Sequence, residues 1–276
     1  MKIAAHIPFF FNHNRLQYLI QVIEGLNNFD ELPEIFIYSN KSIKQLAKYK
    51  NVRVKKYRYL QNGRWQFRHT QLGFKIGLRC IRHSFYLTWE CRSVIKKYIK
   101  NFDVQIYLED DILFTKENLE YWFLNKDSLV NNGYNLGFLR VENDDSGNLF
   151  CSDLWSKPSK IIEIQGRKYL VNDINPYCAF WIYDKKELLE FTKSKEWKFN
   201  FLRYNIREKS AIGWHGKDMD RYKDTLLPLV QSENGYKVPY SCAVHHLPNN
   251  YIGHEAFCTI KFPLEYLYVK SEGDFF

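Results

Sequence analysis

One stretch decides the expected fold: Val104-Gln105-Ile106-Tyr107-Leu108-Glu109-Asp110-Asp111-Ile112-Leu113-Phe114. Apolar residues alternate at positions 104, 106 and 108, which is typical of a buried strand, and three carboxylates follow without a break. Thr115 then precedes a helical run, as a helix N-cap does. Unpaired buried carboxylates would take up protons, so the cluster needs a cation. The pattern therefore favours a metal site at the carboxyl end of a strand. The alternative for an isolated Glu-Asp-Asp is a solvated acidic turn.

The charge balance favours an anionic ligand. The chain has 276 residues, with 40 Lys and Arg against 31 Asp and Glu, which gives a net charge of +9. Such a balance suits a nucleotide diphosphate, and it would also suit nucleic acid or a membrane surface. The positive residues are not gathered in a tail or a single helix, which weakens the nucleic-acid interpretation. Aromatic residues make up 17% of the chain, enough for some to line a groove for sugars or bases.

The cysteines and the hydropathy indicate the cellular setting. Six cysteines occur without a Cys-x-x-Cys pair or zinc-like spacing, as expected of buried thiols in a reducing compartment. No apolar run approaches the roughly 20 residues that span a bilayer. The N-terminus runs directly into a strand, with no signal peptide. We therefore expect a soluble cytoplasmic protein, or a catalytic domain cut from something larger.

The order of elements predicts an α/β fold. Strands are expected at 2–9, 34–38, 51–57, 104–108 and 134–142, with helices at 16–26, 42–49, 75–100 and 116–130 between them. Such alternation predicts right-handed crossovers and a mostly parallel sheet. The second half is more mixed, with a hairpin at 160–171, strands at 178–183 and 238–244, and a helix at 185–195. We expect one domain over residues 1–276, with 1–145 built to bind a nucleotide and 146–276 an acceptor.

Two segments carry a resemblance to a known family. They are Ile81-Arg82-His83-Ser84-Phe85-Tyr86-Leu87 and Tyr107-Leu108-Glu109-Asp110-Asp111-Ile112-Leu113-Phe114, with Tyr121-Trp122 after the second. The chain resembles nucleotide-sugar glycosyltransferases of the GT-A fold, most nearly the N-acetylglucosaminyltransferases whose metal motif is also Glu-Asp-Asp. Exostosin-like transferases of viruses and bacteria share the general layout. The resemblance implies a GT-A type fold, in which a Rossmann-like, mostly parallel central sheet is flanked by helices and joined by a mixed acceptor-side half.

The resemblance also implies residue roles on the donor side. Asp111 would ligate a metal, Mn²⁺ or Mg²⁺, that bridges the donor diphosphate, Asp110 would contact the sugar or ribose, and Glu109 would support the site. His83 would touch the nucleotide, and His6 and Pro8 would lie beside the base. Carboxylate oxygens and a diphosphate also favour these two metals on chemical grounds.

Three further groups of residues are candidates for the site. Arg64 and Arg68 belong to a basic loop that could meet phosphate, or could be solvated. His245 and His246 follow a strand late in the chain, where some GT-A enzymes take a metal ligand, although a histidine is more often structural. Trp214, Asn249, Asn250 and Tyr251 are candidates for binding the acceptor.

The expected reaction is metal-dependent transfer of a sugar, from a UDP-sugar, to a hydroxyl of a glycan or glycoprotein, with inversion. An inverting transferase needs a base on the acceptor side. The resembled acetylglucosaminyltransferases place their base after an aromatic-rich stretch and ahead of the last strand, and this resemblance favours Asp218 over Glu208 and Asp220. Surface ion pairs explain all three acids equally well. The alternatives are a metal-dependent nuclease or phosphotransferase, since acidic strand ends also serve two-metal sites, and a nucleic-acid-binding module without catalysis.

Overall fold

The computed structural model describes residues 1–57, 84–199, 204–215 and 219–267. The chain divides into two compact units. The first comprises Met1–Lys116 and Tyr177–Trp214, and the second Glu117–Pro176 and His215–Phe276. The chain therefore enters each unit twice, and the division into a nucleotide-binding and an acceptor-binding half stays a prediction.

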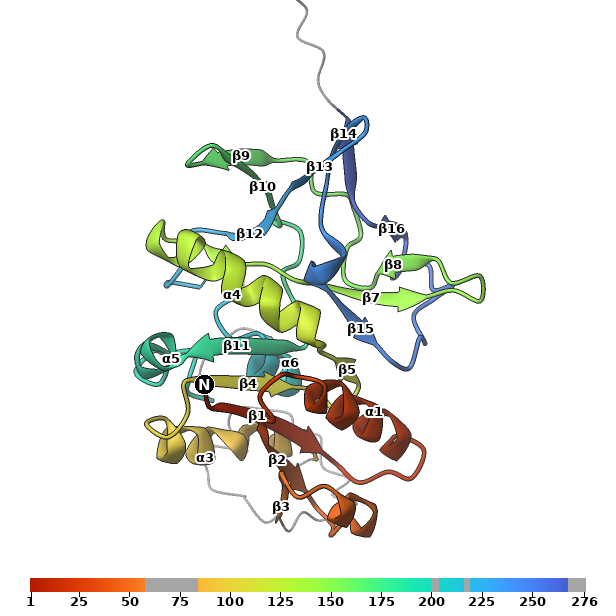
Figure 1. Ribbon diagram of the computed structural model, residues 1–276. Coiled ribbons are helices and arrows are strands. Elements are labelled where there is room, and N and C mark those ends of the chain that lie inside the picture. Colours follow the sequence, from red (N-terminus) through yellow and green to blue (C-terminus); the bar gives the residue numbers. More distant parts are fainter. Residues whose placement is uncertain (58–83, 200–203, 216–218, 268–276) are drawn as a thin grey trace, which may run out of the picture. The chain divides into compact units, whose positions relative to one another are not determined.

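The first unit is built on a five-stranded sheet (Figure 1). Its strands are β1 (Ile3–Phe9), β2 (Glu34–Ser39), β3 (Val52–Lys56), β4 (Val104–Leu108) and β11 (Phe180–Asp184). They lie in the order β11-β4-β1-β2-β3, and every neighbouring pair is parallel except β11 with β4. The predicted α/β class with a mostly parallel sheet is confirmed. From β1 the chain adds β2 and β3 on one side and then β4 on the other, so the strand order reverses between β1 and β4.

Alternation along β11 shows that both faces of this sheet are covered, because successive side chains of a strand point to opposite faces. Phe180 packs edge-on against Phe114, and Phe114 packs against Phe29, which follows α1. Trp181 points the other way, onto Phe191 of α5. The helices of this unit are α1 (Leu16–Asn27), α3 (Cys91–Tyr98), α5 (Lys185–Phe191) and α6 (Ile206–Ala211), with 3₁₀ turns η1 (Lys44–Lys48) and η4 (Ser84–Trp89) and a short strand β5 (Ile112–Leu113).

A buried arginine ties α6 to this sheet. The guanidinium of Arg92, on α3, lies 4.4 Å from the ring centre of Trp197 and 5.3 Å from that of Trp181. Its Nη2 donates to the carbonyl of Ser210 at 3.0 Å, and the indole of Trp181 donates to the same carbonyl. The Ser210 hydroxyl in turn donates to the carbonyl of Thr88. These contacts fix the position of α6 beside η4.

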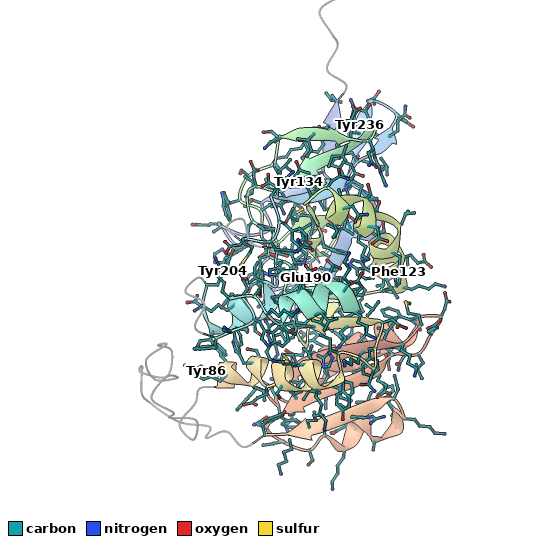
Figure 2. The ribbon with its side chains drawn as sticks, turned by 90° about the vertical axis from the view of Figure 1, so that its left-hand side faces the viewer. Tyr86, Phe123, Tyr134, Glu190, Tyr204 and Tyr236 are labelled. Atoms are coloured by element: carbon teal, nitrogen blue, oxygen red, sulfur yellow. The ribbon has the colours of Figure 1, made fainter. Side chains whose placement is uncertain are left out.

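The second unit is a mixed assembly of short strands around α4 (Lys116–Asn131), and Figure 2 labels Phe123, Tyr134 and Tyr236 within it. One sheet runs β6 (Asn135–Leu136), β12 (Thr225–Pro228), β10 (Arg167–Val171), β9 (Ile161–Ile164). A second contains, side by side, β16 (Ile260–Phe262), β8 (Leu149–Cys151), β7 (Leu139–Asn143) and β15 (Ala243–His246). A third holds β13 (Val230–Ser232), β14 (Gly235–Lys237) and β17 (Glu265–Leu267), and η5 (Tyr240–Cys242) precedes β15. Parallel and antiparallel pairs both occur, as the mixed sequence pattern indicated.

Local structure departs from the sequence prediction at Gly137. The strand expected over 134–142 is divided into β6 and β7. A Cβ at Gly137 would lie 3.0 Å from the Thr225 side chain, and the Gly137 amide donates to the carbonyl of Leu226 at 2.7 Å. Close packing of this backbone on β12 interrupts the strand.

The expected helix over 75–100 is also interrupted within its described part, where η4 ends at Trp89 and α3 begins at Cys91. The five described cysteines are buried thiols. No helix in the described ranges has the length and apolar content needed to cross a bilayer.

Candidate functional site

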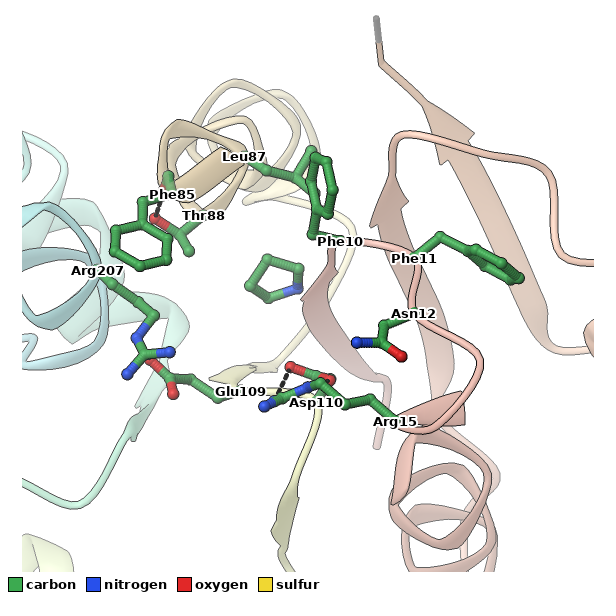
Figure 3. Close-up of a pocket in the computed structure, with 11 residues that line it drawn as sticks. Phe10, Phe11, Asn12, Arg15, Phe85, Leu87, Thr88, Glu109, Asp110 and Arg207 are labelled. Atoms are coloured by element: carbon green, nitrogen blue, oxygen red, sulfur yellow. Dashed lines mark hydrogen bonds and ion pairs between the residues drawn. The ribbon is translucent and has the colours of Figure 1, made fainter. Parts of the chain in front are cut away.

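A cavity of about 340 Å³ lies at the carboxyl ends of β1 and β4 (Figure 3). It is lined by Pro8, Phe10, Phe11, Asn12 and Arg15 from the end of β1 and the segment after it, by Glu109 and Asp110 after β4, by Phe85, Leu87 and Thr88 of η4, and by Arg207 of α6. The strand order reverses between these two strands, and open α/β sheets bind ligands at such a point. The cavity therefore occupies the position in this sheet where a ligand is expected.

On one side of the cavity, Arg15 holds the carboxylate of Asp110 (Figure 3), and it also holds that of Asp111. Its Nε donates to Oδ2 of Asp110 at 2.9 Å, and its Nη2 donates to Oδ1 of Asp110 and to Oδ2 of Asp111, both at 2.8 Å. The side chain of Arg15 is 35% exposed, against 12% for Asp110 and 5% for Asp111. A single guanidinium thus joins both aspartates of the acidic triplet.

Across the cavity, Arg207 faces the third carboxylate (Figure 3). Its Nε lies 3.5 Å from Oε1 of Glu109, and its guanidinium lies 5.4 Å from the ring centre of Phe85. The hydroxyl of Tyr177 donates to the same carboxylate oxygen at 3.3 Å. The amide of Glu109 is fixed by the carbonyl of Ala179, a residue held at a φ of 59°. Left-handed backbone at a non-glycine residue is strained and often accompanies functional sites.

Three carboxylates therefore share two guanidinium groups. Burial and the neighbouring Asp111 raise the pKa of Asp110 from 3.8 to about 6, although Arg15 opposes the shift. The Glu109 carboxylate raises the pKa of Arg207 above its usual value. Near neutral pH, these five side chains together carry three negative and two positive charges. Such an excess attracts a further cation or a proton.

The same residues can be tested as a site for the metal that the resemblance implies. Carboxylate oxygens are the donors that Mn²⁺ and Mg²⁺ prefer, and the excess negative charge suits a divalent ion. Three of the four oxygens of Asp110 and Asp111, however, accept hydrogen bonds from Arg15. No three His, Cys, Asp or Glu side chains in the described part of the chain are arranged to hold a metal. The donor chemistry and charge fit a divalent metal, provided that Arg15 moves away first.

Comparisons with known proteins give only distant likenesses. No family model matches the sequence, and no curated protein matches it. Among solved structures, S. aureus TarS is 11% identical with a TM-score of 0.45, and the match covers 89% of this chain and 36% of that one. The structure of S. aureus TarS 1-349 in complex with UDP-GlcNAc is 11% identical with a TM-score of 0.38, and the match covers 89% of this chain and 58% of that one. The galactosyltransferase LgtC in complex with donor and acceptor sugar analogs is 15% identical with a TM-score of 0.34, and the match covers 76% of this chain and 69% of that one. At such identities and scores, these similarities do not assign the chain to a family.

The structure brings three of the predicted donor-side residues into the cavity: Pro8, Glu109 and Asp110. Asp111 is joined to them through Arg15. His6 is placed differently from our prediction, because it is fully buried, its Nε2 donating to Oε1 of Gln105 and its Nδ1 accepting from Tyr38. Burial lowers the pKa of His6 to about 3. With both ring nitrogens engaged inside the sheet, His6 supports β1 and is not a lining residue.

Several predicted residues have other positions. Trp214 was predicted to contact the acceptor, but it is buried, with its ring against Tyr183 and Phe191. Glu208 lies on α6 next to Arg207 but is not among the lining residues, and Asp220 is exposed in the second unit. Asp218, Arg64, Arg68 and His83 fall outside the described residues.

The late histidines belong to the second unit and have side-chain partners there. His246 is buried, and its Nδ1 pairs with Oε1 of Glu142. The ring of Tyr251 stacks on His246, with ring centres 5.2 Å apart. His245 is hydrogen-bonded through Nε2 to Oδ1 of Asn249 at 2.8 Å, and Asn250 is exposed. Metal binding by His245 or His246 remains a prediction.

The sequence analysis missed both arginines of the cavity. Arg15 lies between the end of β1 and the start of α1, so a cation at the ligand-binding edge could have been anticipated from its place after a strand. Arg207 had no such signal, because α6 is 98 residues from Glu109 in sequence and reaches the cavity only through tertiary packing.

Proposed function

We propose that this protein is a GT-A type glycosyltransferase that moves a sugar from a nucleotide-sugar, most simply a UDP-sugar, to a hydroxyl of a glycan acceptor. The observation that carries the proposal is the cavity at the strand-order reversal, where Arg15 and Arg207 alternate with Glu109 and Asp110. Cations beside carboxylates suit a ligand that combines a diphosphate with sugar hydroxyls.

The chemistry of the cavity matches the parts of such a donor. Its volume of about 340 Å³ lies within the range of small-molecule sites. The forked guanidinium groups of Arg15 and Arg207 suit phosphate oxygens, and the rings of Phe10 and Phe85 offer faces for a base or sugar. Asp110 would accept hydrogen bonds from the hydroxyls of the sugar or ribose. Together these side chains would orient the donor and exclude water from it.

Metal dependence is part of the proposal. Asp111 and Asp110 would hold Mn²⁺ or Mg²⁺ when the donor is present, with Glu109 supporting the site. The ion would supply positive charge to the departing diphosphate. His245 and His246 stay secondary candidates for metal ligands.

We propose inversion at the anomeric carbon. A base would take the proton of the acceptor hydroxyl while its oxygen bonds to that carbon and the bond to the diphosphate breaks. Asp218 is the proposed base, with Glu208 and Asp220 as the other candidates. Asn249, Asn250 and Tyr251 are proposed to hydrogen-bond the acceptor.

The cavity favours this reaction over a two-metal nuclease or phosphotransferase. Two-metal sites hold a pair of ions about 4 Å apart and need several acids directed at them. Among the residues known to line the cavity, the acids are Glu109 and Asp110, and each faces an arginine. A nucleic-acid-binding module would not need buried carboxylates beside its cations.

A thermal-shift screen of UDP-, GDP- and CMP-sugars, with and without Mn²⁺, tests the proposal. A matching donor at 100 times its Kd should stabilise the protein by about 2.7 kcal/mol. The variant Arg207→Met should weaken donor binding about tenfold, because a charge-assisted contact is lost. Arg53→Met is the matched control, since Arg53 pairs with Glu34 and does not line the cavity. Absence of a shift with every nucleotide-sugar, or an equal shift with plain DNA, would overturn the proposed function.

A further inference from the structure

The arrangement of Arg15 has a consequence for metal binding. Its guanidinium occupies three oxygens of the Asp110–Asp111 pair at 2.8 to 2.9 Å. We propose that Arg15 and a divalent metal ion compete for this carboxylate pair, and that Arg15 moves to the diphosphate of the ligand when the metal binds. The competition between Arg15 and the metal rests on geometry alone, whereas the movement of Arg15 to the diphosphate rests on the proposed function.

Competition follows from distance and charge. A bound Mg²⁺ lies about 2.1 Å from each oxygen ligand. The lone pairs that would face it on Asp110 and Asp111 already accept N–H groups of Arg15. A metal on the same oxygens would also place two like charges within a few ångströms of each other, inside a partly buried site. The guanidinium and the metal therefore exclude each other from these oxygens.

We expect Arg15 to leave the Asp110–Asp111 pair only when another cation takes its place. Asp110 and Asp111 are adjacent and their side chains are only 12% and 5% exposed, so their negative charges repel each other when no cation lies between them. Arg15 itself is free of the core, because its side chain is 35% exposed and lines the cavity. The pair can thus release Arg15 when another cation replaces it.

The cavity offers Arg15 a second partner once a diphosphate enters. A guanidinium binds phosphate oxygens through two parallel hydrogen bonds, much as it binds Asp110 here. A nucleoside diphosphate would therefore draw Arg15 from the carboxylates and open them to the metal. The two ligands should bind cooperatively, and the coupling must be the same in either order of addition.

The first test measures Mn²⁺ binding without nucleotide, from the electron paramagnetic resonance signal of free Mn²⁺ over the tag-free full chain. Arg15→Ala should bind Mn²⁺ at least tenfold more tightly than the unmodified protein, because the competing cation is gone. Arg53→Ala removes the same charge from an ion pair outside the cavity and should bind Mn²⁺ as the unmodified protein does. Adding Asp111→Asn to Arg15→Ala should abolish the gain. Equal or weaker Mn²⁺ binding by Arg15→Ala would overturn the proposal.

A conservative variant keeps the test valid if Arg15→Ala fails to fold. Arg15→Lys retains the charge but cannot span both carboxylates with a planar fork. It should bind Mn²⁺ several-fold more tightly than the unmodified protein, with an unchanged circular dichroism spectrum. The same Mn²⁺ affinity in both proteins would count against competition.

The second test adds UDP as the probe. UDP should tighten Mn²⁺ binding at least tenfold in the unmodified protein and by clearly less in Arg15→Ala, where no guanidinium has to be displaced. An equal gain in both proteins would overturn the transfer of Arg15 to the diphosphate. If UDP binds to neither protein, the proposed function and the transfer fail together, while the nucleotide-free measurement still decides the competition.

Discussion

The protein contains two clusters of ionised side chains that differ in how far their side chains are exposed. In the first unit, the cavity holds Glu109, Asp110 and Asp111 against two arginines, one of them 35% exposed. In the second unit, Arg140 binds Asp153 through two hydrogen bonds of 2.7 and 2.8 Å, both side chains being at most 10% exposed. Both clusters contain arginine paired with aspartate, but the arginine of the second cluster is much less exposed.

The second cluster leaves little of its hydrogen-bonding capacity unused. Glu142 is fully buried, with Oε1 on His246 and Oε2 accepting from the amides of Tyr251 at 2.7 Å and Ile252 at 3.1 Å. These hydrogen bonds lower the pKa of Glu142 although burial opposes them. Burial raises the pKa of Asp153, even beside Arg140. Each carboxylate here has its own cationic or ionisable partner, which is the arrangement of a structural cluster.

The difference teaches how to separate a binding site from a scaffold in this protein. A buried carboxylate that is fully hydrogen-bonded holds backbone in place, as Glu142 holds the segment at 251–252. Carboxylates that border a cavity beside partly exposed arginines keep capacity for a ligand, as those around Asp110 do. We therefore expect removal of one acid to cost stability in the second unit and activity in the first.

The largest effect should come from Glu142→Ala. This change removes the acceptor of buried His246 and of two partly buried amides, and breaking a buried pair such as Glu142–His246 costs about 3–5 kcal/mol. Urea unfolding measures the loss in the free energy of unfolding. Glu142→Gln should lose less because it keeps the shape and an acceptor, and the exposed Glu163→Ala should change stability by at most about 0.5 kcal/mol. A Glu142→Ala protein as stable as the unmodified one would contradict the structural role of the cluster in the second unit.

The next effect is expected from Asp111→Asn. Neutralising this carboxylate removes one ligand of the proposed metal and one partner of Arg15, so turnover should fall by about 100- to 1000-fold. The melting temperature should stay near that of the unmodified protein, since an amide fills the same space. Donor hydrolysis measures the rate, and Asp127→Asn, on an exposed side chain of α4, is the control. Near-normal turnover in Asp111→Asn would show that the acidic cluster is structural in both units.

The smallest effect concerns a buried neutral group in the first unit. Because the pKa of His6 falls from 6.5 to about 3 on folding, the unfolded chain binds more protons between these values. The free energy of unfolding should therefore decrease as the pH falls below about 6.5, by up to about 1.4 kcal/mol per pH unit from this residue. His6→Gln should remove that part, so that stability drops about 2 kcal/mol less between pH 7 and 5. The raised pKa of Asp110 changes the pH dependence of stability in the opposite direction. Asp110 is present in both proteins, so its contribution cancels when their profiles are compared. Parallel pH profiles would contradict the buried neutral state of His6.

The sequence by itself determined the local parts of the first unit. Alternation in 104–108 and the 3.6-residue stripe from Leu16 to Leu26 are periodic over a few residues, and β4 and α1 follow them closely. Three acids directly after an apolar strand also placed the site, because the carboxyl ends of parallel strands are where such sheets bind ligands. Residues close together in the chain determine these features, so a short window of sequence is enough to predict them.

Only the tertiary structure decided what surrounds the acids. Arg15 is 95 residues from Asp110, and the two meet because β1 and β4 pair in parallel, with Ile3 opposite Val104. Trp214 enters the core because Gly213, at a φ of 56°, turns the chain toward Tyr183. Strand register and packing select these contacts from many possible ones, and neither leaves a periodic trace in the sequence. The sequence therefore predicts that the acids need a cation, and the fold places Arg15 beside Asp110 and Asp111 and Arg207 beside Glu109.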